Sequence, residues 1–205
     1  MHKRDALGTI ARSAVLAGAA LLFCACTPQP SATFQGIDLT GVDYGKDLPL
    51  PDFNGQPRHL RDFAGKVVVV FFGYTQCPDV CPTTLAELAD VKRALGAQGD
   101  RLQALFVTVD PQRDTPEVLK AYVTYFDPSF LALRGTPEQL AAVAKDFRIY
   151  YKRVAGPTPT SYTMEHSAGS YLFDPAGRLR VYHRYGGGVQ ALTADVRALL
   201  QEKTP

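Results

Sequence analysis

The strongest constraint on the fold of this chain is an unbroken apolar segment, VVVVFF, at residues 67–72. A strand with one face in water alternates apolar and polar residues, whereas a strand covered on both faces is apolar throughout. The segment therefore predicts a strand at the centre of a sheet, with other elements packed on both of its faces.

Helical and extended patterns alternate downstream of this strand. Two segments that begin near Pro116 and Pro137 carry apolar residues at i, i+3, i+4 and i+7 and are predicted helices, with Thr115 and Thr136 as N-caps. Further helices are expected at residues 82–95 and 192–200, and strands at residues 105–109, 130–133, 149–154, 170–173 and 179–183. Alternation that ends in an antiparallel hairpin and a closing helix indicates an α/β domain with a mixed central sheet flanked by helices.

An N-terminal hairpin is expected ahead of the central strand. Residues 48–60 contain the dipeptide Asn54-Gly55 between two extended segments. Asn-Gly is the preferred pair for a tight hairpin turn. The predicted fold therefore carries a hairpin extension on its N-terminal side.

The first 26 residues have the pattern of an export signal. A short basic stretch precedes an apolar run at residues 14–23, which is too short to span a bilayer core of about 30 Å. The segment ends at Cys26, which follows Ala25, as in bacterial lipoprotein processing sites. We expect a signal peptide with Cys26 as the lipidation site, a tether at residues 27–33, and one domain at residues 34–205, lipid-anchored on the periplasmic side of the bacterial membrane. The alternative is an ordinary signal with incidental thiols.

Charge argues against a nucleic-acid partner. The chain has a formal net charge of +2, and this excess arises in the N-terminal segment from Lys3, Arg4 and Arg12 against Asp5. The expected domain is therefore neutral and lacks the basic surface that binding to a phosphate backbone requires.

The expected domain contains two cysteines, Cys77 and Cys81, between the central strand and the next helix. Pro82 is typical of a first helical position, which places Cys81 at the N-cap. Because the helix dipole and free N–H groups favour a thiolate there, we expect a lowered pKa for Cys81.

Three interpretations of this cysteine pair stay open on spacing alone. A structural disulfide would close a loop too short to exclude much chain entropy. A redox-active dithiol fits the order of strand, cysteine pair and helix, although three residues intervene here instead of the usual two. A metal site fits two soft thiolates, which suit Cu(I), and an added imidazole would also accept Cu(II). The available imidazoles are those of His2, His59, His166 and His183.

Three segments closely resemble the Sco/SenC family: residues 72–82 (FGYTQCPDVCP), residues 110–116 (DPQRDTP) and residues 165–177 (EHSAGSYLFDPAG). The resemblance extends over nearly the whole chain after about Phe34. It implies a thioredoxin-like fold and a copper ion, Cu(I) or Cu(II), bound by two cysteines and a histidine. Carried over to this sequence, the ligands are Cys77, Cys81 and His166.

The resemblance also implies a place for His166 in the fold. In thioredoxin-like folds the residues just before the third core strand lie beside the cysteine pair and normally include a cis-proline. Residues 164–168 contain no proline, and His166 stands there instead, in the segment ahead of the predicted strand at residues 170–173. This exchange favours metal binding over disulfide exchange. Two departures from the family are Glu165, where many members have Asp, and an expected lipid anchor instead of a transmembrane helix.

The function implied by the resemblance is that of a copper chaperone for the CuA centre of cytochrome c oxidase, with subunit II as the expected acceptor. Such a protein is a metallochaperone rather than a turnover enzyme. Because oxidation of Cys77 and Cys81 to a disulfide would destroy the site, a thiol reductant protein is a further expected partner. The alternatives are a thiol-disulfide oxidoreductase that uses the same two cysteines on a copper acceptor, and a redox or copper sensor.

Other polar residues are expected to have structural roles. Asp79 either tunes the charge between the cysteines or caps the loop. Asp114 or Thr115 is expected to cap a helix, in preference to acid/base chemistry by Asp114 with Asp110. His183 shares a strand face with apolar residues and is expected to be packed.

Overall fold

The computed structural model describes residues 33–158 and 161–202, and its centre is a six-stranded sheet with the order β1-β10-β9-β4-β5-β6. Strands β4, β5 and β6 are parallel to one another, and β9, β10 and β1 continue the sheet antiparallel on the other side of β4. The strands are β1 (Ile37–Asp38), β4 (Val67–Gly73), β5 (Leu102–Thr108), β6 (Leu131–Leu133), β9 (Ser170–Phe173) and β10 (Leu179–His183). The mixed central sheet is confirmed, and β1 is an additional edge strand that the sequence analysis did not predict.

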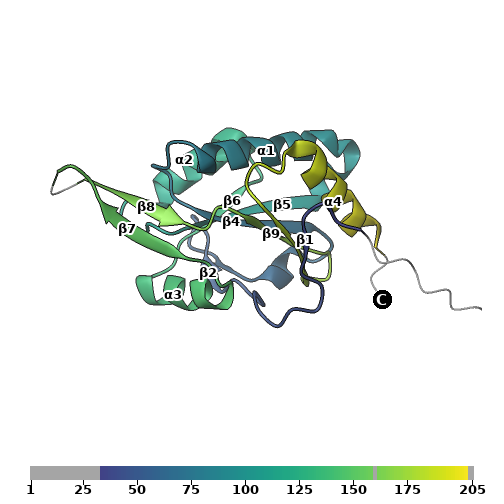
Figure 1. Cartoon of the computed structure of the whole chain (residues 1–205), viewed down its shortest axis with the longest axis horizontal. Helices are drawn as coiled ribbons and strands as arrows, with labels where there is room; N and C mark the ends of the chain where they lie inside the picture. Colours follow the sequence, from purple (N-terminus) through teal and green to yellow (C-terminus); the bar gives the residue numbers. More distant parts are fainter. Residues whose placement is uncertain (1–32, 159–160, 203–205) are drawn as a thin grey trace, which may run out of the picture. The chain divides into compact units, whose positions relative to one another are not determined.

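Helices cover both faces of this sheet (Figure 1). On one face, α1 (Val80–Ala94) packs against α2 (Pro116–Phe126) and α4 (Val189–Gln201), and α3 (Pro137–Asp146) lies on the other face. Short 3-10 helices at Leu60–Phe63 and Gly96–Arg101 lead into β4 and β5.

Every residue of β4 is buried, as its apolar sequence predicts. Successive side chains of a strand point to opposite faces. The ring of Phe71 lies 6.0 Å from that of Phe106, and Phe72 lies 5.3 Å from Phe147, just after α3. The strand is thus apolar because it supplies the core on both sides of the sheet.

The helix starts follow their capping residues. Thr115 accepts a hydrogen bond from the Val118 N–H, and Thr136 accepts one from Gln139, as predicted. The prediction that Cys81 is an N-cap is wrong, because α1 begins at Val80 and its N-cap is Asp79. Pro82 has no N–H group, and it fits the third helical position because the N–H groups of the first helical turn have no partner within the helix.

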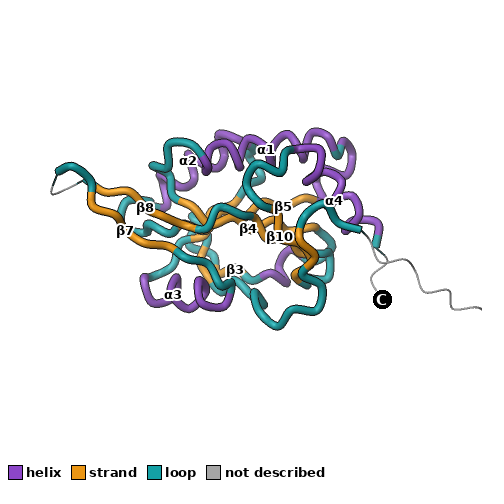
Figure 2. The backbone as a smooth tube through the Cα atoms, viewed as in Figure 1, coloured by secondary structure: helices purple, strands orange, loops and turns teal. Residues whose placement is uncertain are grey.

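Two hairpins lie outside the central sheet. The predicted N-terminal hairpin is confirmed as β2 (Leu50–Pro51) and β3 (Pro57–Arg58), and Gly55 in its turn has a φ of +77°. The second hairpin consists of β7 (Tyr151–Ala155) and β8 (Tyr162–His166), which pair only with each other and extend away from the sheet (Figure 2). Strand β8 was not predicted.

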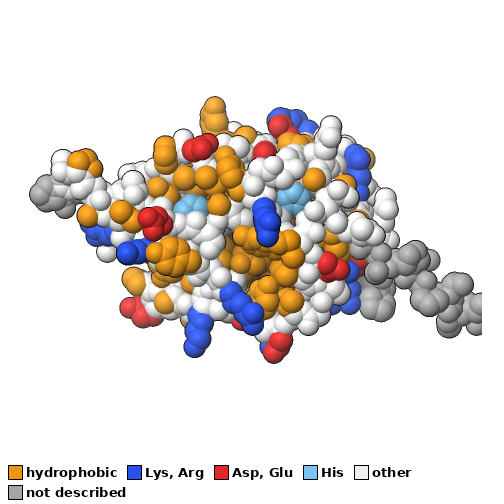
Figure 3. All heavy atoms as spheres, viewed as in Figure 1, with side chains coloured by type: hydrophobic (Ala, Val, Ile, Leu, Met, Phe, Trp, Pro, Cys, Tyr) orange, Lys and Arg blue, Asp and Glu red, His pale blue; other side chains and the backbone are white. Residues whose placement is uncertain are grey.

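The described surface carries charged side chains of both signs, as expected for a domain without net charge (Figure 3). On the face drawn in Figure 3, basic and acidic side chains are interspersed, with hydrophobic side chains gathered between them. Within residues 33–158 and 161–202, no helix combines the length and the apolar character needed to cross a membrane. The expected signal peptide, Cys26 and almost the whole tether lie outside the described residues.

Candidate metal site

The two cysteines lie where the central strand ends and the first helix begins. Cys77 is in the loop after β4, with its N–H donating to the Tyr74 carbonyl, and is partly exposed. Cys81 is the second residue of α1 and is completely buried. A Cβ atom on Gly73 would lie 2.8 Å from the Cys81 sulfur, so the glycine at the end of β4 leaves the space that this sulfur fills. Both thiols are free.

Burial dominates the ionisation of Cys81. Loss of solvent disfavours the charged form and raises the pKa of this thiol far above its ordinary value. The prediction of a lowered pKa for Cys81 is therefore wrong for the metal-free protein, because the start of α1 does not offset the desolvation. Coordination to a cation deprotonates a thiol, so a bound metal would reverse this preference.

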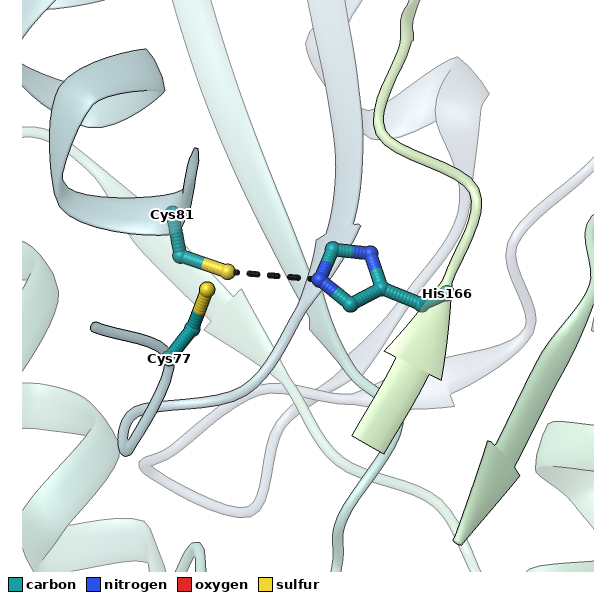
Figure 4. A group of neighbouring side chains, drawn as sticks. All are labelled: Cys77, Cys81 and His166. Carbon is teal, nitrogen blue, oxygen red and sulfur yellow. Dashed lines mark hydrogen bonds between the residues drawn. The ribbon is translucent and has the colours of Figure 1, made fainter. Parts of the chain in front are cut away.

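His166 is the last residue of β8 and approaches the two sulfurs from the opposite side (Figure 4). Its Nε2 atom lies 3.6 Å from the Cys81 sulfur, and its Nδ1 atom lies 3.0 Å from the Ser167 carbonyl oxygen. Because a carbonyl only accepts, Nδ1 carries the hydrogen and the lone pair of Nε2 faces the cysteines. Burial lowers the pKa of His166, which favours the neutral ring that a metal ligand requires.

The three predicted ligands therefore converge. One ligand atom from each of Cys77, Cys81 and His166 lies within 4.8 Å of the other two. Donors bound to one ion at about 2.3 Å lie about 4 Å apart, so small side-chain movements place all three on a single metal. Two sulfurs and one imidazole suit a soft ion such as Cu(I), and the imidazole extends the site to Cu(II).

Comparisons with known proteins identify the family. The model of the SCO1/SenC family matches residues 39–201. An SCO2-like protein of Rickettsia felis is 36% identical over 160 residues, which cover 77% of this chain and 78% of the relative. This chain belongs to the SCO1/SenC family. The mitochondrial SCO2 homologue of Mus musculus is 37% identical over 153 residues, which cover 74% of this SCO1/SenC chain and 60% of the mouse protein.

Solved structures of SCO1/SenC proteins share the fold. ScoI of Bradyrhizobium japonicum with copper bound is 39% identical, with a TM-score of 0.69 over 76% of this chain and 98% of that chain. Yeast Sco1 with copper bound is 31% identical, with a TM-score of 0.72, and the match covers 80% of this chain and 92% of the yeast chain. The apo Sco1 protein of Thermus thermophilus is 37% identical, with a TM-score of 0.73, and the match covers 83% of this chain and 99% of the Thermus chain. The predicted thioredoxin-like fold is confirmed.

A buried carboxylate supports the cysteine loop of this SCO1/SenC chain. Asp114 is fully buried and accepts hydrogen bonds from the Thr75 hydroxyl (2.6 Å), the Thr75 N–H (3.2 Å) and the Thr108 hydroxyl (2.5 Å). Burial raises the pKa of Asp114 despite these bonds. Thr115 alone caps α2, so Asp114 is not a helix cap and instead ties the start of the cysteine loop to the end of β5.

The remaining predicted polar residues lie outside the three-donor group. His183 is buried on β10 with its Nε2 atom 3.5 Å from Asp195, so the packed interpretation is confirmed. Asp79 accepts a 3.5 Å hydrogen bond from the Tyr185 hydroxyl. This contact links the start of α1 to the loop before α4.

Three further residues hold the segments around the site and were not predicted from the sequence: Thr75, Arg113 and Tyr162. Two signals were present. Arg113 lies within the DPQRDTP segment, and Tyr162 lies four residues before His166 in an alternating pattern. Alternation over residues 162–166 is typical of a strand with one buried face.

Proposed function

We propose that this SCO1/SenC chain is a copper chaperone, which binds one copper ion through Cys77, Cys81 and His166 and passes it to the CuA centre of cytochrome c oxidase. The observation that carries the proposal is the convergence of two thiols and an imidazole within 4.8 Å. Copper is bound in the solved relatives of Bradyrhizobium japonicum and yeast. The assembly role and the acceptor, subunit II of the oxidase, rest on the family resemblance.

The unequal exposure of the two sulfurs suggests an order of transfer. Cys77 is partly exposed, so an acceptor thiolate or imidazole reaches the metal from its side first. Cys81 is buried and is the last donor to be released. Copper then moves by stepwise exchange of ligands, without a change of its charge. Since both sulfurs must be reduced to bind, a thiol reductant protein supplies two electrons whenever they form a disulfide.

Replacement of His166 by alanine tests the three-ligand site. His166→Ala removes the one nitrogen donor, and we expect it to abolish stoichiometric copper retention, with a fall in Cu(I) affinity of more than about tenfold. The measurement is anaerobic titration of the reduced protein with Cu(I) against a competing chelator, together with the sulfur-to-copper charge-transfer band after addition of Cu(II).

His59→Ala is the matched control, because His59 pairs with Asp47 at 2.6 Å and lies outside the three-donor group. It is expected to bind copper like the wild type. One tightly held copper ion in His166→Ala would exclude the proposed ligand set.

A thiol-disulfide oxidoreductase is the second candidate, favoured by two free cysteines of which one is partly exposed and one buried. The same His166→Ala variant separates the two functions. Reduction of an acceptor disulfide needs only the cysteines and survives the substitution, whereas copper transfer to that acceptor does not.

We also propose that the domain is exported and anchored to the periplasmic side of the bacterial membrane through a lipid on Cys26. The signal-like first 26 residues support this, with Ala25 before Cys26. In a bacterial host, Cys26→Ser is expected to abolish incorporation of labelled fatty acid and to shift most of the protein out of the membrane fraction. Cys24→Ser is the control and is expected to remain lipidated; equal labelling of Cys26→Ser and the wild type would contradict the anchor.

A further inference from the structure

Arg113, in the loop between β5 and α2, contacts three segments around the candidate metal site. Its Nε–H donates to Asp110 in its own loop. Its Nη1 group donates to the Gln76 side-chain oxygen at 2.9 Å, next to Cys77, and to the Tyr162 carbonyl oxygen at 3.0 Å, at the start of β8. One guanidinium therefore joins the cysteine loop to the strand that ends in His166.

The same network holds the side chain of Tyr162. The Arg113 guanidinium lies 3.6 Å from the centre of the Tyr162 ring, and the Tyr162 hydroxyl donates to Asp110 at 2.9 Å. Arg153 of β7 lies 3.8 Å from the centre of the same ring. Tyr162, Met164 and His166 are the less exposed residues of β8, so the anchored tyrosine and the candidate ligand share one face of this strand.

The hairpin needs such an anchor because β7 and β8 form a two-stranded sheet of their own. An isolated two-stranded hairpin is at best marginally stable in water. At its base, Ser167 and Tyr150 hydrogen-bond to each other through backbone and side-chain atoms. These bonds join the two sides of the hairpin, but they do not connect it to the cysteine loop.

We propose that Arg113 is a positioning residue that, with Asp110 and Tyr162, clamps the β7–β8 hairpin against the cysteine loop and keeps His166 at metal-binding distance from both sulfurs. The consequence for copper rests on the proposed function. The planar guanidinium stacks on the Tyr162 ring, lies 5.8 Å from the centre of the Tyr74 ring and donates to three acceptors at once, which the single ammonium of lysine does not reproduce. Among the described residues, the Arg113 Nη2 atom is buried without a partner. Such a group is costly to bury, so the contacts of the other nitrogens of Arg113 must offset its desolvation.

The test compares Arg113→Ala and Arg113→Lys with Arg153→Ala, which removes the other cation on Tyr162 without a contact to the cysteine loop. The first readout is free of metal: nuclear Overhauser effects between the His166 ring and the ring of Phe71 in β4, whose centroids lie 6.1 Å apart, in the reduced protein. We expect both Arg113 variants to lose at least about half of this intensity, and Arg153→Ala to retain it. Arg113→Lys keeps a cation beside Asp110, so it covers the case in which the alanine variant does not fold.

The second readout is Cu(I) affinity, which we expect to fall on the order of tenfold in the Arg113 variants, as for other residues that orient a metal ligand. Wild-type intensity of the His166 signals in both Arg113 variants would overturn the proposal. If the wild type itself binds no copper, the proposed function fails, and the metal-free spectra still decide whether Arg113 positions His166.

Discussion

Replacing Cys81 with serine is expected to reduce Cu(I) affinity by more than about 100-fold, because loss of a residue that only orients a ligand costs about 10–100-fold and Cys81 is proposed to bind the metal directly. A serine hydroxyl is a hard, neutral donor and a poor ligand for a soft ion. Its oxygen occupies less space than sulfur beside Gly73, so the fold has room for it. The measurement is anaerobic titration of the reduced protein against a Cu(I) chelator.

Thermal unfolding of metal-free Cys81→Ser separates lost ligation from lost structure. Thr84→Ser is a control on the same buried face of α1, and its hydroxyl retains the hydrogen bond to the Val80 carbonyl. Copper binding is expected to stay at wild-type affinity in this control. A variant lacking the Cys81 sulfur that still holds one equivalent of Cu(I) would show that the buried thiol is not a ligand.

Replacing Asp114 with alanine is expected to lower the free energy of unfolding by about 3 kcal/mol. The substitution leaves one N–H and two hydroxyl groups without their acceptor, and each unsatisfied buried group costs about 1–3 kcal/mol, with the hydroxyls able to turn to other partners. Because Thr75 leads into the cysteine loop, Cu(I) affinity is expected to fall as well. Urea denaturation of the reduced, metal-free protein measures the stability change.

Asp114→Asn is the matched variant, because its amide oxygen still accepts one or two of these hydrogen bonds without a buried charge. It is expected to lose clearly less stability than Asp114→Ala. An alanine variant within about 0.5 kcal/mol of the wild type would mean that Asp114 does not support the loop, since changes of that size are typical of surface positions.

The elements that the sequence predicts well are those whose signal is local. The apolar run of β4 and the threonine-proline starts of α2 and α3 each follow from a few neighbouring residues, and the structure confirms them. The N-cap of α1 was misplaced because proline is tolerated throughout the first turn, so Pro82 alone does not fix the first helical residue. The pKa of Cys81 was predicted in the wrong direction for a different reason. The helix start is visible in the sequence, whereas the depth of burial depends on how distant segments pack.

The sequence likewise predicted only part of the candidate metal site. The spacing of the cysteines indicated one half, and the family resemblance supplied His166, but neither showed what holds the two halves together. The alternation of residues 162–166 is only five residues long, so strand β8 was missed; its pairing with β7 becomes visible only in the structure. The contacts of Arg113 with Gln76 and Tyr162 join residues 37 and 49 positions away, which no local pattern encodes.

The histidine nitrogen and the cysteine sulfur that face each other come from positions 85 residues apart. While the chain is being synthesised, the two thiols emerge long before the imidazole does. Until His166 has been placed, Cys77 and Cys81 form a flexible pair of thiols, which a soft ion can bind and an oxidant can convert to a disulfide. The complete donor set exists only after the β7–β8 hairpin has docked, so correct loading with metal must follow folding.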